Sequence, residues 1–189
     1  MSDVIIRTAR LEDAEGIGHV HVAAWQDSYR GIVPERLINA YTPTGRARRW
    51  SEILTAAQSG GGALVRVAEA NGEILGFGCA GAQRDAHLAK IGYAGEVSAL
   101  YLHSSARGRG LGRRLMRKLM ADLLAQGHGS MALWVLKGND RARAFYWAMG
   151  GMYLMDREDE ERGVVLYDEA YGWSDLEAAL APSSDRASD

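Results

Sequence analysis

The chain of 189 residues has a single cysteine, Cys79, and almost no net charge. One cysteine excludes an internal disulfide and a cysteine-clustered zinc site, and we expect Cys79 to pack as a small apolar residue. Lys and Arg together number 22 against 24 Asp and Glu, which gives a formal charge of -2. That balance argues against a surface that binds nucleic acid or an anionic membrane.

Long apolar runs are also missing. Charges or glycines interrupt every hydrophobic stretch before the roughly 18–20 residues that a membrane helix needs. Residues 1–7 lack a basic segment followed by an apolar core, so we expect no signal peptide and a cytoplasmic location. His19 and His21 are two apart on a predicted helix and do not share a face. They make a poor metal pair, and we expect no metal.

The composition that remains is that of one globular domain. Hydrophobic residues make up 47% and charged residues 24% of the chain, near the averages for soluble domains. At roughly 100–200 residues per domain, the length fits one domain. We assign residues 1–175 to it and residues 176–189 to a polar C-terminal tail, whose last part, 182–189, is expected to fray.

Hydrophobic periodicity and turn signals predict alternating strands and helices. Strands are expected over 4–7, 63–70, 73–82, 95–103, 131–136, 152–157 and 163–171, with Asn71-Gly72 as a hairpin turn. Helices are expected over 12–29, from Pro34 onward, and over 46–58, 111–126 and 139–149, with polar connections over 83–94 and 158–162. This order predicts an α/β or α+β fold around one twisted sheet.

The segment with the clearest chemistry joins the strand over 95–103 to the helix over 111–126. It is basic and rich in glycine, with Arg107, Gly108, Arg109, Gly110, Gly112 and Arg113. Glycines let the backbone approach a ligand and reach positive φ. The N-terminus of a helix presents unpaired N–H groups to an anion, and arginines add charge-assisted hydrogen bonds. The segment therefore predicts a phosphate-binding turn.

The glycine spacing separates this turn from two common nucleotide-binding motifs. Glycines at 108, 110 and 112 do not match the G-x-G-x-x-G dinucleotide fingerprint, and a Walker-type Lys followed by Ser or Thr is missing. Nucleotide hydrolysis is not indicated. A plain glycine-rich helix start and a basic helix for nucleic acid over 107–118 are the alternatives. Leucines at 111, 115, 119 and 123 give that helix an apolar stripe, which favours packing over nucleic-acid binding.

The R-x-x-G-x-G pattern of residues 107–112 resembles the pyrophosphate-binding motif of the GNAT acetyltransferase superfamily, whose members use acetyl-CoA. Two further segments resemble family signatures: N-x-x-A-x-x-F-Y from Asn139 to Tyr146, and W-x-x-x-Y-x-G-x-x-P from Trp25 to Pro34. The element order agrees, so the resemblance covers about residues 4–171. It implies a single domain with a central mixed, mostly antiparallel twisted sheet of six to seven strands, flanked by about four helices.

The resemblance also implies which residues bind acetyl-CoA. Carried over onto this sequence, they are Leu100, Tyr101, Leu102, Arg107, Gly108, Arg109, Gly110, Leu111, Gly112, Arg113, Asn139 and Tyr146. Main-chain N–H groups of 100–102, where the family's strand bulges and splays from its neighbour, would polarise the thioester. Tyr146 occupies the family's general-acid position. As an alternative or in addition, Asn139 is a good helix cap and Tyr146 a core aromatic.

Glu96 is the candidate base that takes the proton of the acceptor amine. It is the only acid in its predicted strand, similar enzymes often place a glutamate there, and desolvation would raise its pKa toward neutrality. A solvent-facing carboxylate or an ion pair with an arginine is the alternative, and a water chain could carry the proton instead. His103, at the strand end, is a second candidate base.

Trp25 and Tyr29 lie where family members shape the acceptor cleft. An aromatic wall suits an apolar amine, a sugar amine or a peptide N-terminus equally, and the acids over 156–161 either attract a cationic acceptor or form a solvated hairpin tip. The resemblance implies direct transfer of acetyl from acetyl-CoA to a primary amine of a small molecule or peptide, without nucleic acid or membrane partners, in what is often a homodimer. A non-catalytic CoA-binding module and a transferase of longer acyl groups are the alternatives.

Overall fold

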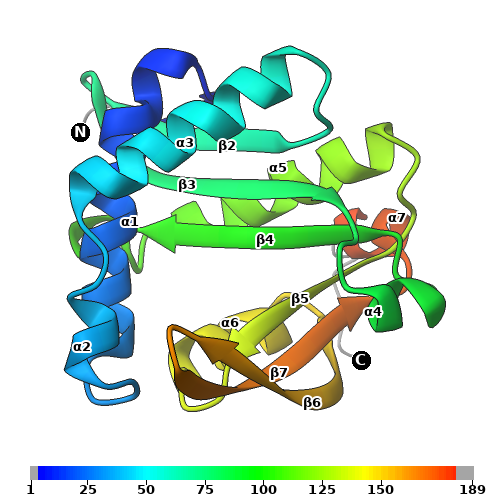
Figure 1. Ribbon diagram of the computed structural model, residues 1–189. Helices are drawn as coiled ribbons and strands as arrows, with labels where there is room; N and C mark the ends of the chain where they lie inside the picture. Colours follow the sequence, from blue (N-terminus) through cyan, green and yellow to red (C-terminus); the bar gives the residue numbers. More distant parts are fainter. Residues whose placement is uncertain (1–3, 182–189) are drawn as a thin grey trace, which may run out of the picture.

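One sheet of seven strands runs through residues 4–181, the part of the chain that the computed structural model describes (Figure 1). The strands are β1 (Ile5–Thr8), β2 (Leu64–Ala70), β3 (Glu73–Ala82), β4 (Gly95–Leu102), β5 (Met131–Leu136), β6 (Met152–Glu161) and β7 (Val164–Trp173). Their order is β1-β2-β3-β4-β5-β7-β6. Only β4 and β5 pair in parallel within this sheet. The predicted mixed, mostly antiparallel sheet is confirmed.

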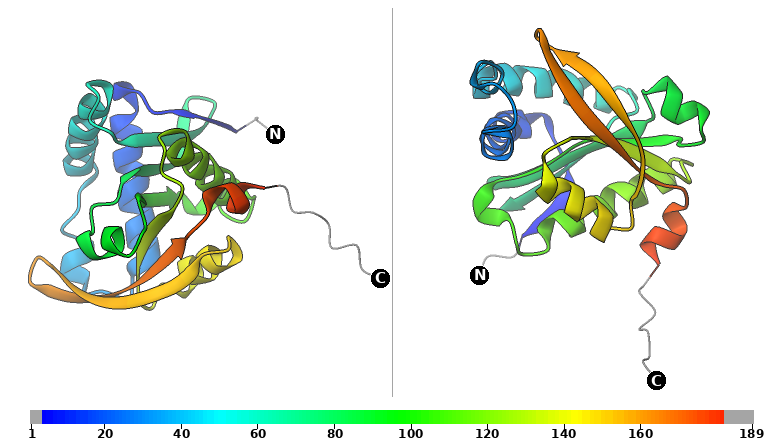
Figure 2. Two further views of the ribbon diagram at one scale, coloured as in Figure 1. Left: turned by 90° about the vertical axis from the view of Figure 1, so that its right-hand side faces the viewer. Right: turned by 90° about the horizontal axis from the view of Figure 1, so that it is seen from below.

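Helices cover both faces of the sheet (Figures 1 and 2). In the described chain they are α1 (Ala14–Tyr29), α2 (Glu35–Ile38), α3 (Pro43–Gln58), α4 (Ala86–Lys90), α5 (Leu111–Ala125), α6 (Asp140–Ala148) and α7 (Leu176–Leu180), with short 3-10 turns at Leu11–Asp13 and Ser104–Ala106. Helices α1 and α3 pack on one face of β2, β3 and β4, and α5 packs on the other. No helix in residues 4–181 is long and apolar enough to cross a membrane.

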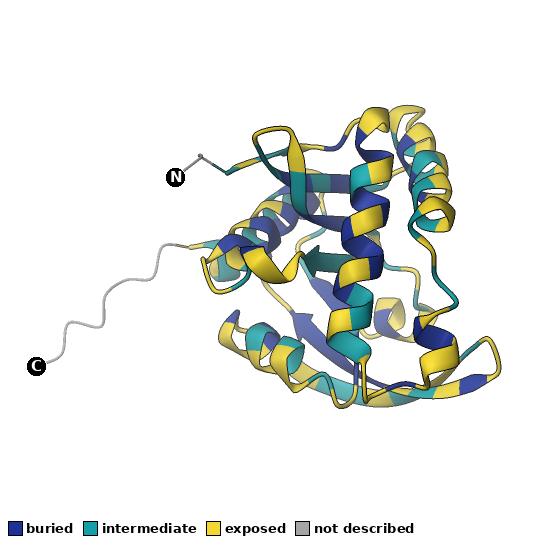
Figure 3. Ribbon diagram, turned by 90° about the vertical axis from the view of Figure 1, so that its left-hand side faces the viewer, coloured by how far each residue is buried: buried dark blue, intermediate teal, exposed yellow. Residues whose placement is uncertain are grey.

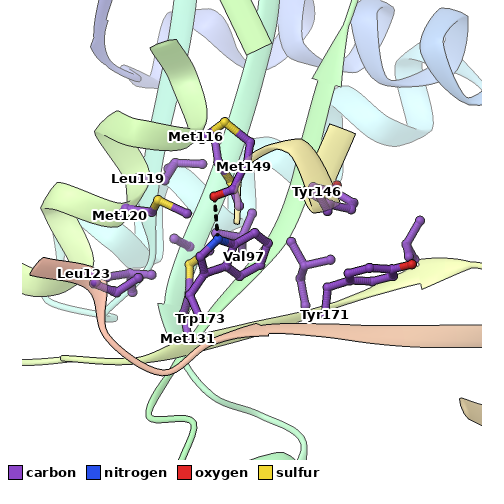
Figure 4. Packing of buried hydrophobic residues seen from close by; sticks show 14 residues of the cluster. Val97, Met116, Leu119, Met120, Leu123, Met131, Tyr146, Met149, Tyr171 and Trp173 are labelled. Carbon is purple, nitrogen blue, oxygen red and sulfur yellow. Dashed lines mark hydrogen bonds between the residues drawn. The ribbon is translucent and has the colours of Figure 1, made fainter. Parts of the chain in front are cut away.

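The leucine stripe of α5 packs into two clusters of the core. Leu115, Leu119 and Leu123 are fully buried, as the four-residue spacing predicts; Leu119 and Leu123 belong to the larger cluster and Leu115 to a smaller one. Figure 4 shows the larger cluster around Trp173 of β7, whose indole Nε1 donates a hydrogen bond to the carbonyl of Met149 at 2.9 Å. A further cluster lies under α1, where buried residues recur between exposed ones (Figure 3).

Helix starts were the least predictable boundaries, because side-chain caps set them. Helix α3 begins at Pro43 rather than at 46, since the Thr42 hydroxyl accepts the N–H of Gly45 at 3.1 Å. Helix α4 lies inside the predicted polar connection over 83–94. Its cap, Asp85, accepts the N–H groups of His87 and Leu88.

The C-terminal boundary also differs from the sequence prediction. Residues 176–180, assigned there to a polar tail, form α7, because Asp175 caps the helix and Leu176 is fully buried in the core. Arg117 of α5 donates hydrogen bonds to the carbonyls of Ala179 and Leu180. Residues 182–189 of the predicted tail lie outside the described residues.

The hairpin of β6 and β7 is longer than predicted. Its strands extend over the acidic segment that was expected to be a turn over 158–162 and meet at Arg162 and Gly163, both with positive φ, as a tight two-residue hairpin requires. The tip lies beside α2 (Figure 1), where Arg36 donates hydrogen bonds to the carbonyls of Arg162 and Gly163.

Candidate active site

The two parallel strands diverge at the centre of the sheet. β4 and β5 pair only at Gly95–Met131 and Glu96–Ala132. On the other side of β4, the register with β3 shifts so that Ser98 has no partner residue, which is a β-bulge. The expected bulge and divergence are therefore present, with the bulge just before Leu100. Beyond it, the β5-facing edge of β4 has no strand partner.

A cavity of about 400 Å³ occupies this opening. Its walls come from β4, the glycine-rich turn, the start of α5, β5, α6 and the end of α1. Residues of the predicted coenzyme-binding set that line it are Leu100, Tyr101, Leu102, Arg107, Gly108, Gly110, Leu111, Gly112, Arg113, Asn139 and Tyr146. Arg109 of that set does not line it. Of the acceptor-site candidates, Tyr29 lines the cavity and Trp25 does not.

The glycine-rich turn has the backbone that the sequence pattern predicts. Gly108 and Gly110 have φ of 74° and 73°, values that residues with a side chain rarely adopt. Gly110 is the N-cap of α5 and supplies no capping side chain. The first N–H groups of a helix have no partner within the helix. They are thus free to bind an anion at the mouth of the cavity.

Arg107 already has a partner on α1. Its Nη1 donates to the Asp27 carboxylate, and its Nε donates to the carbonyl of Leu102 at 3.2 Å. The side chain is mostly buried. Arg107, which the sequence predicts to bind phosphate, thus also connects the end of β4 to α1.

Asn139 and Tyr146 place α6 against the cavity. The Asn139 side chain accepts the N–H of Ala142 at 3.2 Å and so caps α6. Tyr146 is buried in the core but reaches the cavity wall. Burial raises the pKa of its phenol well above the ordinary value, and the nearby Tyr29 adds to the shift. The group is therefore protonated, and can donate a proton, at any physiological pH.

Glu96 is buried and ion-paired. Its carboxylate accepts hydrogen bonds from Arg84 Nε at 2.7 Å and Nη2 at 2.8 Å, and from the Arg84 main-chain N–H at 3.3 Å. Glu96 does not line the cavity, although the next residue, Val97, does. The arginine ion pair considered as an alternative from sequence is therefore formed. His103 is exposed and contacts Ser105.

A second carboxylate escaped the sequence analysis. Asp168 of β7 is buried, and burial raises its pKa although two hydrogen bonds from Arg157, at 3.2 and 3.0 Å, oppose the shift. Its charge also affects the pKa of Tyr29 in the cavity wall. The available signal was an acidic pair, Asp168-Glu169, inside an otherwise mainly apolar strand.

Tyr41 and Arg46 extend the predicted aromatic pair of Trp25 and Tyr29 into a cluster behind the cavity that sequence reasoning did not foresee. The Trp25 ring packs at a tilt against the Tyr29 ring, with centroids 4.4 Å apart, and meets the Tyr41 ring edge-on at 5.2 Å. The Arg46 guanidinium lies 3.7 Å above the Tyr41 ring. These residues come from α1, the loop before α3 and α3 itself, so no local motif joins them. Within residues 4–181, no cluster of three or more His, Cys, Asp or Glu is arranged to hold a metal.

Comparison with known proteins places this geometry in a family. The sequence model of the acetyltransferase (GNAT) family matches residues 11–150. An uncharacterised N-acetyltransferase of Bacillus subtilis, YuaI, is 33% identical over 175 residues, covering 93% of this chain and 95% of the relative.

Solved structures agree on the fold. The PaiA N-acetyltransferase of Thermoplasma acidophilum, in complex with coenzyme A, has a TM-score of 0.69 at 20% identity and covers 88% of this chain and 98% of its own. YncA of Salmonella typhimurium, a putative acetyltransferase with acetyl-CoA, has a TM-score of 0.67 at 22% identity, covering 97% and 99%. With the family match over most of the chain, the conclusion is direct: this chain belongs to the GNAT acetyltransferase family.

Proposed function

We propose that the protein moves an acetyl group from acetyl-CoA to a primary amine by direct transfer in a ternary complex. The cavity between β4 and β5 is the observation that carries this proposal, because it leads from the free N–H groups of α5 to Tyr146. The acetyl-CoA present in the Salmonella structure of the same fold supports the choice of donor.

Each wall of the cavity then has a chemical task. The N-terminus of α5 binds the pyrophosphate, and the unpaired edge of β4 offers main-chain groups to the amides of the pantetheine arm. Main-chain N–H groups of 100–102 stabilise the oxyanion that forms on the acetyl carbonyl. As the N–C bond forms and the C–S bond breaks, Tyr146 gives its proton to the departing thiolate.

Glu96 is the proposed acceptor of the amine's proton, through a bridging water because it stands back from the cavity. Its pairing with Arg84 competes with this role. Asp168 is the second candidate, since its buried carboxylate has a raised pKa and acts electrostatically on Tyr29. The presence of both Glu96 and Tyr146 favours an enzyme over a non-catalytic CoA-binding module.

Calorimetric titration with acetyl-CoA, CoA and ATP tests the proposed donor. We expect acetyl-CoA to bind with micromolar or tighter affinity and ATP to bind far more weakly. Gly110→Glu should weaken acetyl-CoA binding by roughly 100-fold or more, because the new carboxylate repels the phosphates and the side chain disturbs the turn geometry. A library of amines is then tested as acceptors, with the release of free CoA thiol as the measure of acetyl transfer.

Gly127→Glu is the matched control for this titration. Gly127 follows the other end of α5 with φ 86° and open space around its Cα, as Gly110 has with φ 73°. Both variants therefore carry the same backbone strain and the same new charge. Equal loss of binding in the two variants, or no binding of acetyl-CoA to the folded wild type, would contradict the proposal.

A further inference from the structure

Arg46, in the first turn of α3, has no ion-pair partner among the described residues. Five other partly buried arginines each pair with a carboxylate: Arg7 with Asp13, Arg66 with Asp122, Arg107 with Asp27, Arg143 with Glu169 and Arg157 with Asp168. A sixth, Arg117, donates to the carbonyls of Ala179 and Leu180. Arg46 instead buries its Nε without a hydrogen-bond partner. The Tyr41 ring beneath the guanidinium offsets part of the cost of burying a cation without a counter-charge, but the Nε donor stays unsatisfied.

The charge around Arg46 is positive on the hairpin side as well. Arg162, at the tip of β6 and β7, has its Cζ 5.4 Å from the centroid of the Tyr41 ring that Arg46 also covers. Burial lowers the pKa of Arg46, and the charges of Arg162 and Arg49 lower it further, against an opposing effect of Tyr101. In the described chain no carboxylate forms an ion pair with Arg46 or Arg162. The site therefore favours an anion.

The unpaired polar atoms nearby are donors. The Trp25 indole Nε1 and the Tyr41 hydroxyl are, like the Arg46 Nε, buried without a hydrogen-bond partner in residues 4–181. Indole and guanidinium N–H groups only donate, and a phenol can donate. Buried polar groups are normally paired. Because the cluster lacks acceptors, the ligand group that fits it best is a carboxylate, which only accepts.

This donor cluster lies directly behind the cavity. Tyr29 lines the cavity, and its ring packs against that of Trp25 with centroids 4.4 Å apart. Tyr101 also lines it and is electrostatically coupled to Arg46. These two tyrosines therefore join the cavity wall to the donor cluster around Arg46.

We propose that the acceptor is an amino acid, in which the amine to be acetylated is accompanied by a carboxylate, and that Arg46 binds this carboxylate. The inference rests on the proposed acetyltransferase function and adds the class of its acceptor. It argues against a cationic acceptor, which the acidic hairpin segment had suggested, because Arg46 and Arg162 place positive charge beside the Tyr41 ring.

Pairs of acceptors that differ only in the carboxylate test the proposal: L-leucine with isoamylamine, and L-phenylalanine with phenethylamine. Thiol release from saturating acetyl-CoA gives kcat and KM for each. We expect kcat/KM to favour the amino acid by about 10- to 100-fold, the range for a charge-assisted pair. Arg46→Met should erase this preference, mainly through KM, and leave the plain amine unchanged. Arg46→Lys should restore it only partly, since Lys lacks the planar fork.

Arg49→Met is the matched control, because Arg49 lies one turn along the same helix, is exposed and pairs with Glu52. Arg49→Met should not change kcat or KM for either member of a pair. The thermal stability of Arg46→Met and its affinity for acetyl-CoA should equal those of the wild type, which separates a binding role from a structural one. Equal turnover of both members of each pair, or an equal loss for both in Arg46→Met, overturns the proposal.

Direct binding decides the case in which no tested amine is turned over. N-acetyl-L-leucine and N-isoamylacetamide are titrated into the CoA complex, or into the free protein if CoA does not bind. The Nε–H resonance of Arg46, identified by its loss in Arg46→Met, is followed by NMR. A shift with N-acetyl-L-leucine but not with N-isoamylacetamide supports the inference. No shift with either probe refutes it, whereas failure of acetyl-CoA to bind refutes the proposed function independently.

Discussion

The two faces of the sheet around β4 differ in how their charged and polar groups are satisfied. On the α5 face, the Arg66 guanidinium of β2 donates two hydrogen bonds, of 2.6 and 2.8 Å, to the Asp122 carboxylate. On the α1–α3 face, Arg46 has no carboxylate partner within residues 4–181, and two neighbouring donors there are unpaired. The partly buried arginine of the first face thus has its counter-charge within the fold, whereas that of the second face does not. This difference separates an arginine expected to stabilise the fold from one proposed to bind a ligand.

The largest effect should come from exchanging one arginine on each face for methionine. Arg66→Met leaves the buried Asp122 with only Lys118, at 3.4 Å, as an ion-pair partner, and should cost about 3 kcal/mol of unfolding free energy. Arg46→Met removes an unpaired charge and should cost close to nothing. Urea denaturation of the two variants and the wild type measures both. A comparable loss for Arg46→Met would erase the contrast between the faces.

Tyr146→Phe should lower kcat about 100-fold, roughly 2.7 kcal/mol, because the departing thiolate loses its proton donor. The affinity for acetyl-CoA should change by only a few fold, since the ring still fills its place. Steady-state kinetics and calorimetry separate the two quantities. Tyr153→Phe is the control, because Tyr153 is half exposed and its hydroxyl contacts Asp156. Unchanged kcat in Tyr146→Phe would remove the proposed acid.

Glu96→Gln should lower kcat/KM by about 10- to 100-fold, as expected for the loss of a general base. The variant should fold normally, because its partner Arg84 is 72% exposed and such pairs contribute little stability. Asp168→Asn is measured in parallel. If Asp168→Asn loses activity and Glu96→Gln keeps it, the base lies on β7 instead.

The smallest effect concerns pH and His21, at the centre of the α1–α3 face. Burial, together with the charge of Arg46, lowers the pKa of His21 to about 3, and its Nδ1 accepts the indole N–H of Trp50 at 3.0 Å. Below the unfolded pKa of about 6.5, only the unfolded chain takes up this proton, so stability should fall as pH drops.

The expected slope for this one group approaches 1.4 kcal/mol per pH unit between its two pKa values. Denaturation curves between roughly pH 5 and 7.5 measure it. His21→Gln should flatten the curve, while the same change at the exposed His19 should not. A slope that persists in His21→Gln would assign it to other groups.

Sequence reasoning reached the α5 face because that face is built from local patterns. The leucine spacing of α5, the glycines of positive φ and the N-x-x-A-x-x-F-Y segment all lie within short stretches, and each predicts its own backbone. The divergence of β4 from β5 after Glu96 followed only from the family resemblance. Residue propensities predict strands but not which residues of two strands pair.

In the aromatic cluster of the α1–α3 face only Trp25 and Tyr29 were predicted as site residues, because the other members join them only after folding. Tyr41 and Arg46 come from separate segments, and Arg46 looks in the sequence like any surface arginine of an amphipathic helix. Arg84 and Glu96 are 12 residues apart, so their pairing was open to sequence analysis only as one alternative. Caps by Thr42, Asp85 and Asp175 were missed because each polar residue has many other uses in a loop.

The position of β7 has a consequence for synthesis of the protein on the ribosome. β7 is the last strand to be made, yet it lies between β5 and β6. Until it emerges, β5 and β6 have unpaired edges. Val164 and Leu166, which pack in one cluster with Trp25 and Tyr29, and the buried Asp168 have not yet been made. The emerging chain can therefore assemble β1 to β4 with α1, α3 and α5 first. Ribosomes that stop before Val164 would release a chain prone to edge-to-edge aggregation and without a finished active site.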